Sequence, residues 1–168
     1  MVGRCIPEDN YEFVISEFMN SDLDKDLVII TNYKDNPYYE KLKDVTKFEE
    51  DKRIKFINGV YDMDKLSTIR KNAYLYIHGH SVGGTNPSLI EALSLTNINI
   101  LYDVCFNKDI GKNSCLYFKN QGSLTKLLNN PSSINNKSNK MGNDAKKIVK
   151  QNFTWPIIIN KYKELFNG

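Results

Sequence analysis

The sequence lacks the features that mark membrane-spanning, secreted and disulfide-stabilised proteins. None of its apolar runs approaches the roughly 20 residues that a spanning helix needs, and the first residues, MVGRCIP, contain no apolar signal core. Only three cysteines are present, Cys5, Cys105 and Cys115, and their spacing matches no metal site. We therefore expect a cytoplasmic protein whose cysteines are buried, reduced thiols rather than partners in a disulfide.

The sequence also lacks an excess of charge of one sign. It has 23 Lys and Arg against 20 Asp and Glu, a net charge of +3, and the two signs are interspersed. A nucleic-acid-binding domain usually concentrates basic residues on one face, so no nucleic acid is expected as a partner. Internal repeats and heptads are absent as well. With 168 residues, of which 40% are hydrophobic, the chain is long enough to bury a core.

Strands and helices alternate along the chain. An apolar run at 26–31, bounded by polar residues, is typical of a strand covered on both faces. Apolar residues at i, i+3, i+4 and i+7 predict an amphipathic helix that begins near Pro7 and buries Tyr11, Val14, Ile15 and Phe18. The same patterns predict strands at 2–6, 53–57, 73–77, 99–103 and 115–118, helices at 37–45, 63–70, 87–95, 122–129, 143–151 and 154–166, and loops at 104–113 and 129–140.

This alternation predicts the fold class. Successive parallel strands need crossover connections, which helices supply. The sequence therefore predicts an α/β fold, a Rossmann-like doubly wound parallel sheet of about six strands with C-terminal helices.

The most distinctive stretch is 78–92, which reads HGHSVGGTNPSLIEA. It follows a predicted strand and leads into a predicted helix, so its glycines lie at a strand-to-helix turn, where open α/β sheets bind ligands. Gly83 and Gly84 allow backbone N–H groups to approach an anion, and the free N–H groups at the helix start, near Asn86, favour a phosphate. The motif predicts a phosphate-bearing ligand; the alternative is a tight turn that needs only flexibility.

Four segments together resemble a known enzyme family. They are VGR at 2–4, GVY at 59–61, the motif at 78–92 and FN at 106–107. This set resembles the C-terminal half of family-4 retaining glycosyltransferases of the GT-B fold, and most of all that of bacterial rhamnosyltransferases that build capsular and cell-wall polysaccharides. The resemblance implies that residues 1–152 form a nucleotide-sugar-binding Rossmann-like domain. It also implies that the helix within 153–168 packs on a partner domain absent from this chain.

The resemblance assigns roles around the diphosphate and ribose of the donor. Glu91 would accept hydrogen bonds from the ribose hydroxyls; the sequence alone favours a solvated helix glutamate, and the motif reverses that preference. The motif residues Gly83, Gly84, Thr85 and Asn86 would surround the diphosphate. Arg4 would pair with it, a role that suits a planar and permanently charged side chain.

Other residues of the resemblance concern the base and the sugar. Gly59, Val60 and Tyr61 would hold the nucleotide base, with Tyr61 stacked on it, although Tyr61 would also suit an ordinary surface or core position. His80 would hydrogen-bond the donor sugar or a phosphate rather than act as a general base. His78, still on the strand, is expected to be a hydrogen-bonded structural residue.

The sequence departs from the family pattern at two places. Gly83 stands where many family-4 enzymes carry a glutamate that contacts the donor sugar, so that contact must come from another residue. Asp9 and Asn10 stand where many carry a lysine, so the charge of the diphosphate would be neutralised less fully.

The sequence and the resemblance thus predict the donor-binding domain of a retaining glycosyltransferase that moves a hexose, with rhamnose as a candidate, from a nucleoside diphosphate to a saccharide acceptor. No metal and no cofactor beyond the donor substrate are expected. An N-terminal acceptor-binding domain, in cis or in trans, would complete the cleft and could provide contact with the inner membrane face. The chain alone should bind the donor but transfer sugar poorly. Alternatives are a non-catalytic nucleotide-sugar-binding or interaction module and an unrelated doubly wound phosphate binder.

Overall fold

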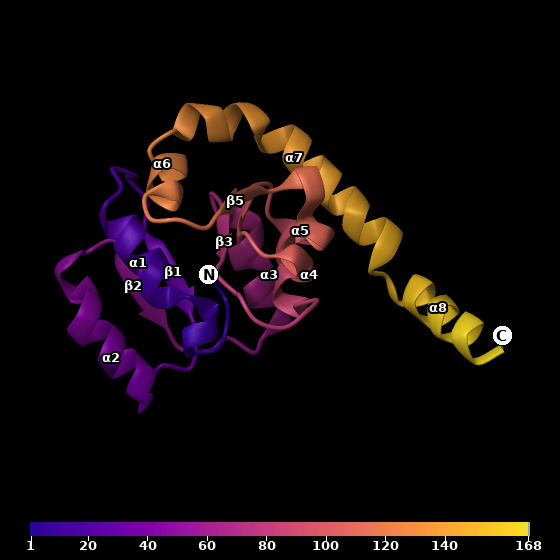
Figure 1. The fold of residues 1–168 in the computed structure, drawn as a ribbon, viewed down its shortest axis with the longest axis horizontal. Helices are drawn as coiled ribbons and strands as arrows, with labels where there is room; N and C mark the ends of the chain where they lie inside the picture. Colours follow the sequence, from indigo (N-terminus) through magenta and orange to yellow (C-terminus); the bar gives the residue numbers. More distant parts are fainter. Residues whose placement is uncertain (168) are drawn as a thin grey trace.

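Five short strands lie at the centre of the part of the chain that the computed structural model describes, residues 1–167. They are β1 (Leu27–Ile30), β2 (Ile54–Ile57), β3 (Tyr76–His78), β4 (Asn99–Tyr102) and β5 (Leu116–Phe118). One sheet pairs β1 with β2, and the other has the order β3-β4-β5 (Figure 1). All of these pairings are parallel, as the alternating pattern predicts. Gly168, the last residue of the predicted terminal segment, lies outside the described residues.

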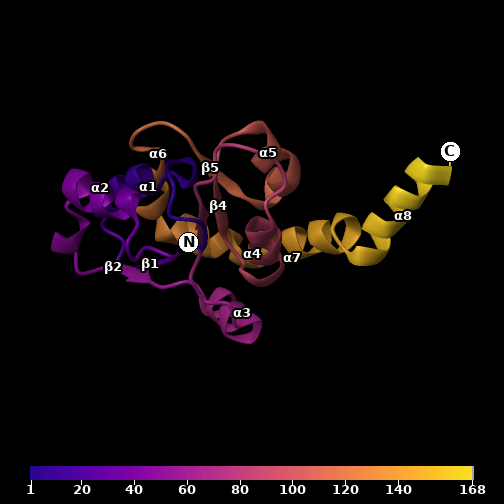
Figure 2. The same cartoon turned by 90° about the horizontal axis from the view of Figure 1, so that it is seen from below.

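Helices connect the strands and cover them. They are α1 (Tyr11–Met19), α2 (Pro37–Thr46), α3 (Met63–Asn72), α4 (Pro87–Leu95), α5 (Cys105–Gly111), α6 (Ser123–Leu128), α7 (Pro131–Asn152) and α8 (Trp155–Asn167), with 3-10 turns at Pro7–Asp9, Phe48–Glu50 and Lys112–Ser114. Helix α1 packs against α2 and α6, whereas α4 packs against α3 and α7. Helix α3 lies on the opposite side of the strands from α1 and α2 (Figure 2). The arrangement is the doubly wound α/β layering that the sequence predicts.

The predicted apolar faces of α1 and α4 form much of the core. Tyr11, Val14, Ile15 and Phe18 of α1 are all buried, as predicted. Leu89, Ala92 and Leu93 of α4 are completely buried. Asn36 and Asp62 accept hydrogen bonds from the first turns of α2 and α3, so the helix starts follow from ordinary capping side chains.

The prediction of one sheet of about six strands is wrong. Of the predicted strand at 2–6, only Val2 makes a β-bridge, with Ile30 of β1. The N–H of Ile30 donates to the carbonyl of Met1 (3.0 Å), and Gly3 N–H donates to Ile30 (3.2 Å). The chain then turns at Arg4, whose carbonyl accepts from Ile6 N–H (2.9 Å), and enters the 3-10 turn, so no strand can extend further.

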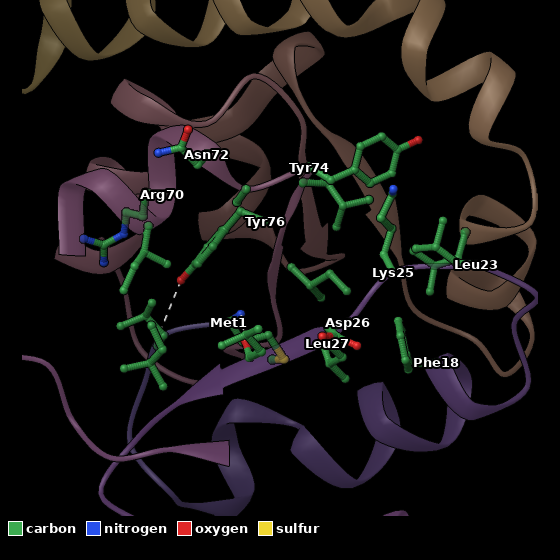
Figure 3. A pocket seen from close by; sticks show the side chains of 18 residues that line it. Met1, Phe18, Leu23, Lys25, Asp26, Leu27, Arg70, Asn72, Tyr74 and Tyr76 are labelled. Atoms are coloured by element: carbon green, nitrogen blue, oxygen red, sulfur yellow. Dashed lines mark hydrogen bonds between the residues drawn. The ribbon is translucent and has the colours of Figure 1, made fainter. Parts of the chain in front are cut away.

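A cavity of about 700 Å³ separates the two sheets (Figure 3). It lies between β1 and β3, where a central strand would join them, and its walls are largely apolar. On one side Tyr76 reaches across and donates its hydroxyl proton to the Val2 carbonyl (3.2 Å). This side-chain hydrogen bond therefore takes the place of a main-chain ladder between Val2 and β3 in the described residues.

Two predicted loops are helical. The segment 104–113 contains α5, which is short and has no side-chain cap, so its sequence carries few helix signals. The segment 129–140 contains the first half of α7. There the Asn130 side chain accepts from Ser133 N–H (3.1 Å) and Pro131 occupies the first turn. Ile134 is the one buried residue of this half and packs against the core, so a single apolar contact anchors a stretch that is otherwise rich in Asn and Ser.

The prediction for the cysteines holds for two of three. Cys5 and Cys115 are buried free thiols, whereas Cys105 is free but exposed. Cys105 is the first residue of α5, within the segment predicted as a loop.

Helix α8 projects away from the rest of the molecule in both views (Figures 1 and 2). Its large apolar side chains are exposed: Trp155, Ile159, Tyr162, Leu165 and Phe166. Whether they pack on a partner domain stays a prediction. No helix among residues 1–167 is both long enough and apolar enough to cross a bilayer.

A buried carboxylate joins α1 to the start of α6. Glu17 is 3% exposed and accepts hydrogen bonds from the backbone N–H groups of Gly122 (2.6 Å), Leu124 (3.1 Å) and Thr125 (3.0 Å). Burial acts to raise the pKa of Glu17, but the hydrogen bonds from Thr125, Gly122 and Leu124 together outweigh it and lower the pKa. The ionised form is therefore favoured in the folded protein.

We expect Glu17→Gln to lower the free energy of unfolding by about 1.5–3 kcal/mol, because it weakens several charge-assisted hydrogen bonds. Glu12→Gln, on the same helix, is the control: its side chain is half-buried and makes only a surface ion pair with Lys41 at 3.6 Å, so the loss should stay below about 1 kcal/mol. Since the folded-state pKa is lowered, the stabilisation is complete above the ordinary value of 4.5 and is lost as pH falls through the folded-state pKa. Urea unfolding should show a Glu17→Gln penalty that shrinks in acid; a penalty independent of pH would contradict this account.

Candidate functional site

The glycine-rich turn between β3 and α4 is exposed at its tip and anchored at both ends. Gly83, Gly84 and Thr85 are exposed. Gly83 has φ +120°, a conformation that L side chains rarely adopt, which explains glycine at this position. Asn86 caps α4 by accepting from Ser88 N–H (2.9 Å), so α4 begins where the sequence predicts.

The N-terminal segment anchors the start of this turn. Asp9 Oδ1 lies 2.8 Å from His80 Nδ1, and Asp9 Oδ2 accepts from the backbone N–H of Arg4 (2.9 Å). The Asn10 side-chain amide donates to the carbonyl of Gly79 (2.6 Å). Asp9 and Asn10, which depart from the family pattern, therefore connect two parts of the site that are about 70 residues apart.

Gly79 is needed for this contact. A Cβ atom at Gly79 would overlap the backbone carbonyl oxygen of Asp9. By contrast, a Cβ atom at Gly84 would meet nothing within 4 Å. These two of the three glycines in the motif therefore have different roles: Gly79 permits close packing, and Gly84 keeps the exposed turn free of side chains.

His80 has one nitrogen engaged and one directed at the turn. Its ring is buried, with 7% of the residue exposed. While Nδ1 meets Asp9, Nε2 lies 3.5 Å from the position that a Cβ atom would take on Gly83. The backbone carbonyl of His80 accepts from the buried side chain of Asn107 (2.9 Å), so Asp9 holds the ring and Asn107 holds the backbone.

His78 is buried, but only part of its prediction holds. Its Nε2 has no hydrogen-bond partner among residues 1–167, so it is structural without being hydrogen-bonded there. Burial, followed by the nearby His80 and the N-terminal amine, lowers the pKa of His78 to about 3. The ring is therefore neutral and makes a poor candidate for acid–base chemistry.

A pocket of about 450 Å³ brings together several predicted site residues. Arg4 lines it with Gly59, Val60 and Tyr61, and Ser88 contributes from the first turn of α4. The guanidinium of Arg4 has no ion-pair or hydrogen-bond partner in the described part of the chain. The pocket thus combines an available cation with a helix N-terminus.

Tyr61 stands at the edge of this pocket. It is 79% exposed, and its hydroxyl oxygen lies 2.5 Å from the side-chain nitrogen of Asn32, which donates to it. Asn32 also accepts from Gly59 N–H (3.2 Å). One face of the Tyr61 ring is therefore available for stacking while its hydroxyl is held in place.

The carboxylate of Glu91 is paired through one of its two oxygens. Its Oε2 lies 2.6 Å from Nη1 of Arg70, a side chain that is only 2% exposed. Arg70 also donates from Nη2 to Ser88 Oγ (3.0 Å). Arg70 therefore ties Glu91 to Ser88, which lines the pocket.

Sequence reasoning did not assign Arg70 and Asn107 to the site. It noted Asp9 only as a position that lacks the family's lysine, and did not identify it as a partner of His80. Arg70 lies one turn after the buried Leu66, on the same face of α3, but nothing in the local sequence shows which group its charge meets. Asn107 lies in the segment taken for a loop; its side chain also donates to Tyr102 (2.9 Å). Only a knowledge of which elements pack together could reveal these contacts.

Within the described chain, no three His, Cys, Asp or Glu side chains are grouped so that they could hold a metal ion. Asp62 and Asp64 form an Asp-x-Asp pair, but Asp62 accepts from Asp64 N–H (3.1 Å) as the cap of α3.

We expect Gly79→Ala to lower the free energy of unfolding by about 1–3 kcal/mol, because the new methyl group forces backbone segments apart. Gly84→Ala, in open space, should change it by less than about 0.5 kcal/mol. Urea unfolding of both variants measures the difference. Equal stabilities would show that the Asp9 and Gly79 backbones are not in close contact.

Comparisons with known proteins identify the fold. No protein-family model matches the chain. In sequence it is similar to an uncharacterised glycosyltransferase of Methanocaldococcus jannaschii, with 28% identity over 98% of this chain and 43% of the relative. The chain thus spans less than half the length of that relative.

Several solved structures resemble the chain in fold at low sequence identity. Anabaena HepE in complex with UDP has a TM-score of 0.82 at 14% identity, covering 99% of this chain and 48% of HepE. The catalytic domain of cholesterol-α-glucosyltransferase from Helicobacter pylori has a TM-score of 0.71 at 20% identity, covering 90% and 96%. The C-terminal domain of a Francisella tularensis group 1 glycosyltransferase has a TM-score of 0.69 at 14% identity, covering 92% and 85%. The chain therefore has the Rossmann-like α/β fold of one half of a GT-B glycosyltransferase.

Proposed function

We propose that the chain is the donor-binding half of a retaining glycosyltransferase and that its ligand is a nucleoside diphosphate sugar. This proposal rests on the pocket lined by Arg4, Gly59, Val60, Tyr61 and Ser88. It offers a free guanidinium and the start of a helix, both of which suit phosphate oxygens. It also offers an exposed aromatic ring, which suits stacking with a nucleotide base. HepE, a structure of the same fold, is in complex with UDP.

The diphosphate would lie between Arg4 and the start of α4. Arg4 supplies a planar cation, and the exposed Gly83, Gly84 and Thr85 present backbone N–H groups without bulky side chains. Asn86 already caps one N–H of the helix through Ser88, and the remaining free N–H groups and the positive end of the helix dipole favour phosphate oxygens. The absence of a lysine near Asp9 makes Arg4 the main cation of this site.

Glu91 would accept hydrogen bonds from the ribose hydroxyls. The carboxylate is held by Arg70 through a single oxygen, Oε2, which leaves Oε1 available. Gly59, Val60 and Tyr61 would contact the base, with the exposed Tyr61 ring stacked on it.

Sugar transfer would require a second, acceptor-binding domain, since the chain spans less than half of HepE. Arg4, the turn N–H groups and the helix dipole would then stabilise the negative charge that develops on the departing diphosphate. We propose a hexose as the transferred sugar, with rhamnose the first to test because of the sequence resemblance, and a saccharide of a surface polysaccharide as the acceptor.

We expect the chain to bind one of UDP, dTDP or GDP in isothermal titration calorimetry. Arg4→Met should weaken that binding by about tenfold, because a charge-assisted hydrogen bond to phosphate is worth about 1.5–3 kcal/mol. Lys41→Met, an exposed cation on α2, is the control and should bind as the unaltered chain does. If none of the three nucleotides produces heat or a thermal shift, the proposed function is wrong.

Glu91→Ala should also weaken nucleotide binding by about tenfold through the lost ribose contact. Because this change leaves the Arg70 guanidinium buried without its partner, the double variant Arg70→Met with Glu91→Ala separates binding from stability. Thermal unfolding should show that the double variant is more stable than Glu91→Ala alone, while both bind weakly. Unchanged affinity in both variants would remove Glu91 from the site.

A further inference from the structure

We propose that Asp9 is a positioning residue for His80 and that it makes Nε2 of His80 a hydrogen-bond acceptor for a hydroxyl of the donor sugar. This inference rests on the proposed function, because it names a further contact in the same site. It begins with the 2.8 Å contact between Asp9 Oδ1 and His80 Nδ1.

The carboxylate of Asp9 determines which ring nitrogen carries the proton. An ionised carboxylate can only accept hydrogen bonds. Its second oxygen, Oδ2, also acts as an acceptor, from the backbone N–H of Arg4 at 2.9 Å. The proton must therefore lie on Nδ1 of His80, and in the neutral ring Nε2 carries the lone pair.

The surroundings fix where this lone pair points. Asp9 and His80 are both buried, with 7% of each residue exposed. Asn107 holds the backbone of His80, the ring of Phe106 lies with its centroid 6.3 Å from the imidazole centroid, and the Asp9 backbone packs on Gly79. With the ring held in this way, Nε2 faces the turn at Gly83, 3.5 Å from a Cβ position that glycine leaves empty.

The chemistry of a lone pair selects the group that it can bind. Phosphate oxygens are acceptors and cannot pair with an acceptor nitrogen, whereas a hydroxyl can donate to it. A nucleotide sugar carries hydroxyls on its ribose and on its hexose. In the proposed function Glu91 already accepts hydrogen bonds from the ribose hydroxyls, so we assign His80 to a hydroxyl of the hexose.

The tautomer is tested by NMR of the chain labelled with ¹⁵N at histidine, at about pH 8, above the ordinary imidazole pKa of about 6.5. The shifts should show His80 protonated at Nδ1 and unprotonated at Nε2. Asp9→Asn should disturb this pattern, and Glu8→Gln should not, because the exposed Glu8 contacts the turn only through its backbone carbonyl. A His80 ring protonated at Nε2 in the unaltered chain would overturn the proposal.

The hydroxyl contact is tested by comparing UDP with UDP-glucose, and dTDP with dTDP-rhamnose, in calorimetry. His80→Gln should weaken binding of the nucleotide sugar by about three- to tenfold and leave binding of the nucleoside diphosphate within about twofold. Asp9→Asn also changes the residue that holds the backbone of Arg4, so it should weaken binding of both ligands, and that of the nucleotide sugar more. In the His80→Gln background, Asp9→Asn should add nothing to that selectivity, which a merely structural role of Asp9 would not predict. Equal losses for diphosphate and sugar would overturn the proposal. If the unaltered chain binds no nucleotide, the proposed function fails, and the proposal of a sugar contact fails with it, whereas the tautomer measurement still decides whether Asp9 positions His80.

Discussion

The close contact between the N-terminal segment and the turn after β3 is the constraint on which the candidate site depends. Asp9 packs its backbone on Gly79 and its carboxylate on His80, and it also holds the backbone of Arg4. The segment that carries Asp9 leads directly into α1, whose apolar face is buried in the core. The stability of the core thus fixes the position of Arg4 relative to the exposed tip of the turn.

Buried charges organise the rest of the site. Arg70 is almost completely buried, and a buried guanidinium is tolerated only when it is paired. Its pairing with Glu91 and Ser88 orients a carboxylate beside the pocket at the start of α4. The exposed groups that could contact a ligand, Arg4 and Tyr61, therefore lie beside charged residues that are already paired with each other.

Much of the fold could be predicted from the sequence because most helices and strands follow from local sequence patterns. The strands β1 to β5, the buried face of α1 and the start of α4 at Asn86 all follow from periodicity and capping. The break between the sheets could not be predicted, because it depends on Val2 alone reaching β1. The polar first half of α7 resembled a loop because a single buried residue, Ile134, anchors it.

The candidate site could be predicted in part, for a related reason. Exposed positions such as Gly83 and Arg4 lie in recognisable motifs, and the pocket joins Arg4 to the segment at 59–61. The partner of His80 is 71 residues away in the chain, and the partner of Glu91 lies on another helix. Such pairings arise from the packing of elements, for which a single sequence holds no local signal.

Mapping a bound nucleotide onto the backbone tests the central claim most directly. Amide chemical shifts of the ¹⁵N-labelled chain would be recorded with and without the nucleoside diphosphate that binds. The account predicts that the shifts change together at Arg4, at Gly59 to Tyr61 and from Gly83 to Glu91, with little change on α2 and α8. Changes confined to other surfaces, or none with UDP, dTDP or GDP, would contradict it.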